Sequence, residues 1–252
     1  MKSRTSLGKA LRLLFAVGET TNPAGISVAE LMSTVKVSRP TAYRLLNELE
    51  RFGLVRSVPK QSMWQLGPKV IALAAQAGSW AMMRRRAKIA MEEFVQAGGP
   101  TVHLGIRDGN EVVYIDKAES PKFATIASAV GQRRPLNVTA LGKCLVAFDP
   151  NPEAAENLAD AGLVGRTQNS ITDRQRWLAE IDQVRKTGIA HDVEECDVGA
   201  YCVAAPICDS QGYAVAAISI SALSIDPGKG DFDRLERKIR QVAANISATS
   251  PA

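Results

Sequence analysis

The hydrophobic and polar positions of residues 38–53 repeat with the period of an α-helix. Ser38 suits the N-cap, Pro40 is tolerated in a first turn, and Gly53 suits the end of a helix. A charged face opposite an apolar one is also what any surface helix presents, so the neighbouring segments must decide what the polar face contacts. At 3.6 residues per turn, the expected core stripe is Ala42, Leu45, Leu46, Leu49 and Phe52, and the polar stripe is Pro40, Tyr43, Arg44, Asn47 and Arg51.

Two more segments before this helix have helical spacing. Residues 6–17 predict one helix and residues 27–35 predict a second, shorter one. Ser27 and Glu30 stand three residues apart, which is the spacing of a capping box at the start of the second helix. Only two residues then separate that helix from Ser38. The order of these elements predicts a helix-turn-helix whose second helix carries the basic face.

A hairpin and a charge asymmetry sharpen this interpretation. Residues 54–58 and 63–66 are short extended runs around a turn-forming tip, which predicts a β-hairpin wing. Residues 1–80 hold 11 Lys and Arg against 4 Asp and Glu, a charge of +7, whereas residues 81–252 hold 20 against 22, a charge of −2. Basic side chains bind polyanions by releasing condensed counterions, so the first third of the chain predicts a winged helix-turn-helix for nucleic acid.

We expect the polar face of the 38–53 helix to lie in a DNA major groove. Arg44 can read guanine or contact phosphate and Asn47 can read adenine, and the sequence does not separate base contacts from backbone contacts. Side chains and free amides in the first turn commonly meet phosphate, and basic residues on the wing would follow the flanking backbone. The predicted DNA-binding residues are Ser38, Arg39, Pro40, Thr41, Tyr43, Arg44, Asn47, Arg56 and Lys60.

Composition narrows the class of protein. The chain has 252 residues, 46% of them hydrophobic, which is enough for sizeable cores. Arg12 interrupts the apolar run near the start, which argues against a signal peptide, and no apolar stretch approaches the about 20 residues of a membrane span. The four cysteines form no CxxC pair, so we expect buried thiols, no metal and no cofactor. We expect a cytoplasmic protein that does not bind a membrane.

The pattern changes after residue 67. Pro68 begins a helix that we expect to run to residue 77, and residues 82–97 are helical again. Strands and helices then segregate rather than alternate, which predicts an α+β domain with an antiparallel sheet. The expected strands are 101–106, 112–117, 201–208 and 213–221, and the expected helices are 140–148, 152–161, 173–186 with Thr172 as its N-cap, and 232–247. The predicted organisation is a DNA-binding domain at 1–67, a linker helix at 68–81 and a second domain at 82–252.

Long motifs in both halves resemble the IclR family of bacterial transcriptional regulators. The matching stretches are SRPTAYRLLNELERFGLV, WQLGPKVIALA, RPLNVTALGKCLVAF and DVEECDVGAYCVAAPICDSQGYAVAAISIS, and the resemblance covers nearly all of the chain. It implies a GAF-like effector-binding domain after the winged helix-turn-helix. It also implies operator DNA and a small-molecule effector as partners, and a homodimer that pairs into a dimer of dimers. Ala222-Leu223 departs from the Gly-Pro common at this place in the family.

The second domain contains a candidate effector pocket. Thr139 suits the N-cap of the 140–148 helix, whose first amides would form an oxyanion site. Ser219 and Ser221 are two apart on a strand and share a face. The family resemblance adds Asp192 as a hydrogen-bond acceptor and Cys202 as a wall. The predicted ligand-binding residues are Ala140, Leu141, Asp192, Cys202, Ser219 and Ser221. We expect a small carboxylate, amide or hydrazide-like effector that also carries a hydroxyl or NH donor.

Several functions remain open on the sequence. The family favours a repressor of a catabolic operon that its effector relieves, and a ligand-activated activator is the alternative. A cysteine-dependent small-molecule hydrolase would use His191, Asp192 and Cys202, but adjacent residues of an extended segment point to opposite sides. A DNA-architectural protein without a ligand would be favoured by a pocket too small or too apolar for any polar solute. We therefore expect a regulator and not an enzyme.

Overall fold

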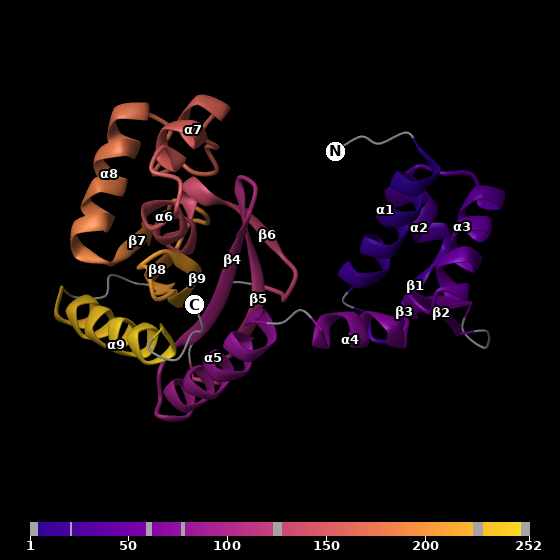
Figure 1. Cartoon of the computed structure of the whole chain (residues 1–252), viewed down its shortest axis with the longest axis horizontal. Helices are drawn as coiled ribbons and strands as arrows, with labels where there is room; N and C mark the ends of the chain where they lie inside the picture. Colours follow the sequence, from indigo (N-terminus) through magenta and orange to yellow (C-terminus); the bar gives the residue numbers. More distant parts are fainter. Residues whose placement is uncertain are drawn as a thin grey trace. The chain divides into compact units, whose positions relative to one another are not determined.

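A computed structural model describes residues 5–20, 22–58, 62–76, 79–122, 128–223 and 229–247. The chain divides into two compact units, Met1–Ala81 and Met82–Ala252. The first unit holds helices α1 to α4 and a small sheet, and the second holds a large sheet with helices on both faces (Figure 1). Within the described residues, no helix is long and apolar enough to cross a membrane.

Three helices build the core of the first unit, as their spacing predicts. Ser27 accepts a hydrogen bond from the amide of Glu30, whose carboxylate accepts one from the Ser27 amide, so the predicted capping box is confirmed. Lys36 is left-handed (φ 55°) and turns the chain toward the third helix. The helices are α1 (Ser6–Glu19), α2 (Val28–Val35) and α3 (Arg39–Arg51), and they enclose the buried side chains Leu13, Leu31, Leu46 and Trp64.

The wing is a three-stranded sheet rather than a lone hairpin. The predicted pair, β2 (Val55–Val58) and β3 (Met63–Leu66), is antiparallel, and β1 (Ile26–Ser27) adds to the free edge of β3. A two-residue strand has no periodicity of its own, so the sequence does not reveal β1. The extra pairing anchors the wing to the start of α2.

Two details of α3 differ from the predicted ones. Phe52 was placed on the core stripe, but α3 ends at Arg51 and the Phe52 side chain is 65% exposed. The turn at Gly53 (φ 71°) leads the chain away before that side chain can reach the core. Ser38 occupies the N-cap, but its hydroxyl bonds the hydroxyl of Thr41 at 2.9 Å and caps no helix amide.

The second unit is an α+β domain, as predicted, with one antiparallel sheet. Its six strands follow the order β6-β5-β4-β9-β8-β7. The last strand of the unit, β9, therefore lies beside the first, β4. The central pairing places Thr101 opposite Ser221 and His103 opposite Ser219. The strands are β4 (Thr101–Asp108), β5 (Glu111–Ala118), β6 (Arg133–Pro135), β7 (Ala190–Val193), β8 (Ala200–Cys208) and β9 (Ala214–Leu223).

Each face of this sheet has its own core. One face packs against α5 and α9 through side chains such as Met91 and Ile239, and the other against α6, α7 and α8 through Trp177 and Ile181 (Figure 1). The helices are α4 (Pro68–Ala75) in the first unit, α5 (Ser79–Gln96), α6 (Ala140–Ala147), α7 (Ala154–Ala161), α8 (Arg174–Thr187) and α9 (Lys229–Ser247). On the second face, α6 contacts the sheet directly, and α7 and α8 pack against α6. The candidate pocket lies on this face.

The N-terminal caps of α6 and α8 fix where these two helices begin. Thr139 caps α6 by accepting a hydrogen bond from the Gly142 amide at 3.0 Å, as predicted. A side chain at Gly142 would overlap the backbone of Leu136, so only glycine lets α6 pack on the short 3-10 helix Leu136–Val138. For α8 the predicted cap was wrong: Asp173, and not Thr172, accepts from the Arg176 amide at 2.8 Å.

Candidate functional site

The recognition surface is the solvent-facing side of α3. The apolar positions Ala42, Leu45, Leu46 and Leu49 are buried, so the helix is fixed in rotation about its own axis. The opposite side then projects into solvent as a set of groups that can read base edges or phosphates. These exposed residues are Arg39, Pro40, Tyr43, Arg44 and Asn47, and the Arg39 guanidinium lies over the Tyr43 ring at 5.8 Å.

The start of α3 and the wing complete this surface. Because Ser38 does not cap the helix, the amides of the first turn stay available to an anion. The Glu50 carboxylate accepts hydrogen bonds from the amide and hydroxyl of Ser57 at 2.7 and 2.9 Å, which ties strand β2 to α3. Arg56 is exposed and donates to Gln65 at 2.6 Å, so the wing presents an ordered guanidinium. Lys60 lies outside the described residues.

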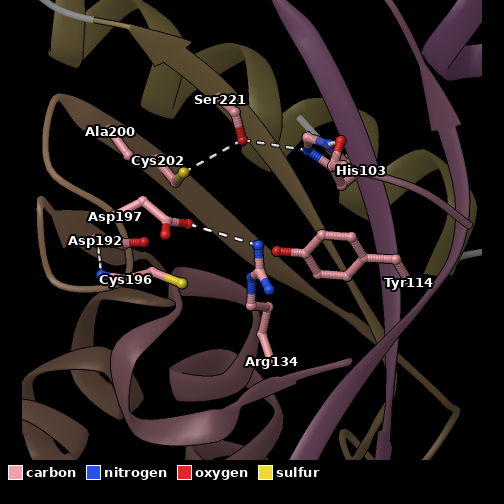
Figure 2. Close-up of a pocket in the computed structure, with 10 residues that line it drawn as sticks. His103, Tyr114, Arg134, Asp192, Cys196, Asp197, Ala200, Cys202 and Ser221 are labelled. Atoms are coloured by element: carbon pink, nitrogen blue, oxygen red, sulfur yellow. Dashed lines mark hydrogen bonds and ion pairs between the residues drawn. The ribbon is translucent and has the colours of Figure 1, made fainter. Parts of the chain in front are cut away.

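A polar hollow in the second unit is lined by residues from all six strands of the large sheet and from two loops. It has a volume of about 30 Å³, which is the scale of a single water molecule. Strand β4 contributes His103, β5 contributes Tyr114, and the central strands contribute Cys202 and Ser221 (Figure 2). The complete lining is His103, Tyr114, Ser128, Arg134, Asp192, Cys196, Asp197, Ala200, Cys202 and Ser221.

A chain of hydrogen bonds orients one wall of the hollow. Ser221 Oγ lies 3.2 Å from His103 Nδ1 and 3.2 Å from Cys202 Sγ (Figure 2). His103 Nε2 lies 2.7 Å from Ser128 Oγ. Burial lowers the pKa of His103 to about 4, helped by the charge of Lys117. The imidazole is therefore neutral at physiological pH. This wall offers hydroxyl, thiol and imidazole groups without a net charge.

The opposite wall carries the charged groups. Asp192 Oδ1 accepts hydrogen bonds from the amides of Glu195 at 2.8 Å and Cys196 at 3.3 Å. Burial nevertheless raises the pKa of Asp192 to about 7, so its carboxyl group is partly protonated at neutral pH. The Arg134 guanidinium lies 3.8 Å from Asp197 and is turned toward the Tyr114 hydroxyl (Figure 2). The hollow thus combines the cation Arg134, the two carboxyl groups of Asp192 and Asp197, and several neutral donors.

The predicted pocket residues divide into two sets. Asp192, Cys202 and Ser221 line the hollow, as the interpretation requires. Ala140, Leu141 and Ser219 do not: they are buried, and Leu141 packs within the core between α6 and β4 near Gly105. The first turn of α6 is covered by its contact with Leu136–Val138. The amides of α6 are therefore not at the surface of the hollow.

Sequence reasoning missed most of the side chains that line the hollow, among them His103, Tyr114, Arg134 and Asp197. His103 and Tyr114 sit on neighbouring strands, and their ring centroids are 5.1 Å apart. A period-two pattern in β4 shows that His103 faces the same side as Thr101, but it does not show which side covers a pocket. Arg134 belongs to the three-residue strand β6, which has no signal in the sequence.

The geometry argues against the catalytic set considered from the sequence. His191 faces away from Asp192, as predicted, and its Nε2 lies 2.9 Å from Glu236 of α9. Burial raises the pKa of Cys202 far above its usual value and that of Cys196 to about 12, so both remain thiols at neutral pH. A cysteine nucleophile needs a thiolate beside a base, and His191, Asp192 and Cys202 do not provide this pair.

The chain matches known proteins along almost its whole length. Residues 6–59 match the IclR helix-turn-helix domain, and residues 76–248 match the bacterial transcriptional regulator IclR C-terminal domain. The regulator KdgR of Escherichia coli (strain K12) is 33% identical over 246 residues, which cover 98% of this chain and 92% of KdgR. The repressor AllR of the same organism is 29% identical over 224 residues, 88% of this chain and 82% of AllR.

A solved structure extends the likeness to three dimensions. The Thermotoga maritima IclR structure is 32% identical, with a TM-score of 0.73, and the match covers 96% of this chain and 97% of that one. A winged helix-turn-helix joined to an α+β domain with a polar hollow defines a ligand-responsive, DNA-binding transcriptional regulator. The chain belongs to the IclR family.

Proposed function

We propose that this regulator binds a pseudo-palindromic operator with α3 in the major groove and represses a catabolic operon. The exposed row on α3, fixed by four buried residues on its other side, is the observation that carries the DNA-binding part. Repression is supported by the relative AllR, which is named a repressor. Ligand-dependent activation is the alternative. In vitro transcription from a selected operator separates the two, because a repressor lowers transcript yield without effector and an activator raises it only with effector.

We infer that the effector is a small organic acid or a related amide that also carries a hydroxyl or NH donor. Arg134 and the Tyr114 hydroxyl, which keeps its proton because burial raises its pKa, can donate to its anionic or carbonyl oxygen, and Asp192 can accept from its donor. The hollow is water-sized, so a larger ligand enters only when lining side chains such as Tyr114 and Arg134 move. This requirement couples binding to a conformational change.

Ala140, Leu141 and Ser219, the predicted residues that do not line the hollow, lie deeper in the domain. Ser219 lies two positions before Ser221 on β9 and faces the same side of the sheet. The start of α6 packs beneath this face. Once the lining opens, the amides of Ala140 and Leu141 and the Ser219 hydroxyl come within reach of a ligand. Calorimetry with a panel of hydroxylated and aromatic carboxylates tests the pocket. If Asp192→Ala or Ser221→Ala binds the selected acid as tightly as the parent, the pocket is elsewhere.

The DNA-binding role also requires two copies of the chain. One recognition helix reads only a few base pairs, so useful specificity needs two related half-sites. Leu7, Leu11 and Phe15 are exposed at a spacing of four on one face of α1, and Leu66 of β3 is exposed close to Gly18 at the end of that helix. We infer that this apolar stripe packs against a second copy. Light scattering of Phe15→Glu against the exposed-surface control Glu19→Gln tests it: only the first should lower the mass and the operator affinity.

A further inference from the structure

A second hollow lies beside α8 and shares no lining residue with the polar hollow. Its volume is about 500 Å³, which is within the range of about 300–1,000 Å³ for small-molecule sites. It lies between α8, strand β7 and the segment that precedes α8. The lining residues are Gln168, Asn169, Ile171, Arg176, Glu180, His191, Val193 and Glu195.

The floor of this hollow has an excess of negative charge. Lys143 is 1% exposed, and its ammonium group donates to Glu180 at 2.9 Å, to Glu195 at 2.6 Å and to the backbone carbonyl of His191 at 2.8 Å. One buried cation therefore faces two carboxylates. The second oxygen of Glu195 is buried and accepts no hydrogen bond within the described structure. A buried carboxylate oxygen without a donor is unfavourable, so a further cation near this floor would stabilise it.

The rim of the hollow carries Arg176, whose side chain pairs with no other described residue. Arg174 pairs with Asp160 at 3.2 Å and Arg185 pairs with Asp182 at 3.2 Å on the same helix. Arg176, between them, is exposed, and its guanidinium has no hydrogen bond or ion pair within the described residues. A guanidinium presents a planar fork of donors that suits a carboxylate. The hollow thus has a negative floor and, at its rim, a guanidinium that no described side chain pairs with.

We propose that this second hollow binds a small zwitterion that carries an ammonium group and a carboxylate. The ammonium group hydrogen-bonds the carboxylate of Glu180, which is 30% exposed, and offsets the charge of Glu195 beside it. The ligand carboxylate lies against the Arg176 guanidinium. Opposite charges at the two ends of one site select a molecule with both groups over one with either group alone. This ligand is distinct from the effector of the polar hollow.

The two hollows are joined by one short segment of backbone. The Glu195 amide donates to Asp192 at 2.8 Å, and Asp192 lines the polar hollow while the Glu195 side chain lines the second one. A ligand that shifts Glu195 therefore changes the hydrogen bond that holds Asp192. The coupling between two ligands is reciprocal, so each changes the affinity of the other by the same factor. The zwitterion would act as a second regulatory input.

Calorimetry on the full chain tests the proposal with unbranched amino acids from glycine to 6-aminohexanoate. This series varies the distance between the ammonium group and the carboxylate, and alkylammonium ions and alkyl carboxylates of equal length are the single-charge controls. We expect one or two lengths to bind and the controls to bind at least about tenfold more weakly, because each control lacks one charge-assisted contact. If no member of the series binds, the proposal is wrong.

Variants then locate the site. Arg176→Ala removes an exposed, unpaired side chain and should weaken binding by about tenfold, whereas Arg174→Ala, two residues away and paired to Asp160, should leave it unchanged. Glu180→Gln should weaken binding while Lys143 keeps Glu195. Equal affinity in Arg176→Ala and the parent would overturn the proposal. Loss of binding in Asp192→Asn with full binding in Arg176→Ala would overturn it too, because the zwitterion would then occupy the polar hollow.

Discussion

The recognition surface of α3 and the polar hollow place their functional groups in opposite environments. Arg39, Arg44 and Asn47 are exposed, so their side chains keep their hydration until DNA arrives. Asp192 and His103 are buried, so burial disfavours their charged forms and shifts both pKa values toward the neutral forms. One surface is ready for a large, highly charged partner. The other can respond to one small solute or one proton.

The largest predicted effect tests the burial of Asp192. Its pKa rises from 3.8 to about 7 on folding, so the unfolded chain loses this proton first as pH increases. The free energy of unfolding therefore falls as pH rises from about 4 to about 7, and above pH 7 this loss of stability is complete. Relative to Asp192→Asn, we expect the free energy of unfolding of the parent to fall by at most about 4 kcal/mol across this window, measured by urea denaturation.

His103 makes that comparison with Asp192→Asn necessary. Its pKa is lowered to about 4 in the folded state, so protonation of the unfolded chain removes stability as pH falls from 6.5 toward 4. The two groups thus act with opposite sign over overlapping pH ranges. The same measurement on His103→Gln, which lacks the opposing group, should show the free energy of unfolding falling more steeply as pH rises. A parent and Asp192→Asn with parallel curves would show that Asp192 ionises normally.

The same carboxyl group predicts how ligand binding depends on pH. An anionic effector next to Asp192 binds better when Asp192 is protonated, so its affinity should fall as pH rises through about 7. Operator binding by α3 should change far less over this range, because the side chains that we assign to DNA do not include Asp192. Calorimetry with the selected acid and operator titrations at pH 6 and pH 8 compare the two. A ligand affinity that rises with pH would contradict an ionisable acceptor beside the anion.

A smaller effect is expected on the recognition surface. Arg44→Ala should weaken operator binding by about 1–3 kcal/mol and relax selectivity at one position of each half-site if Arg44 reads a base. If it contacts phosphate, binding should weaken on all sequences and the salt slope should fall by about one per site. Glu48→Gln on the same helix is the control. Unchanged affinity at every salt concentration would remove Arg44 from the interface.

The smallest predicted effects compare three helix starts. Thr139→Ala and Ser27→Ala each remove a capping hydrogen bond and should cost about 1 kcal/mol of stability, the first in the second unit and the second in the first unit. Ser38→Ala removes no cap, so it should leave stability nearly unchanged and instead weaken DNA binding if its hydroxyl meets phosphate. Equal losses of stability in all three variants would show that Ser38 does cap α3 in solution.

The N-terminal unit could be predicted from its sequence in some detail. Its helices are short-range structures with clear starts, such as Ser27 with Glu30, and their apolar stripes face one core. The exposed side of α3 follows directly from the buried side, because a helix has only one rotation that buries Leu45, Leu46 and Leu49. The misplaced Phe52 marks the limit: the chain direction after Gly53 depends on the wing that follows.

The sequence by itself therefore determined the helix-turn-helix, the α+β class and the strands that carry Cys202 and Ser221, since periodicity and capping act between residues close in the chain. Only the tertiary structure decided the rest of the polar hollow. His103, Arg134 and Asp192 lie 31 to 89 positions apart in the sequence, and they meet because β9 pairs with β4 and β6 closes the edge beyond β5. The same packing buries the start of α6 under Leu136, which no local pattern records. Side-chain environments of this kind come from strand order and layer contacts, and those are set by the whole core.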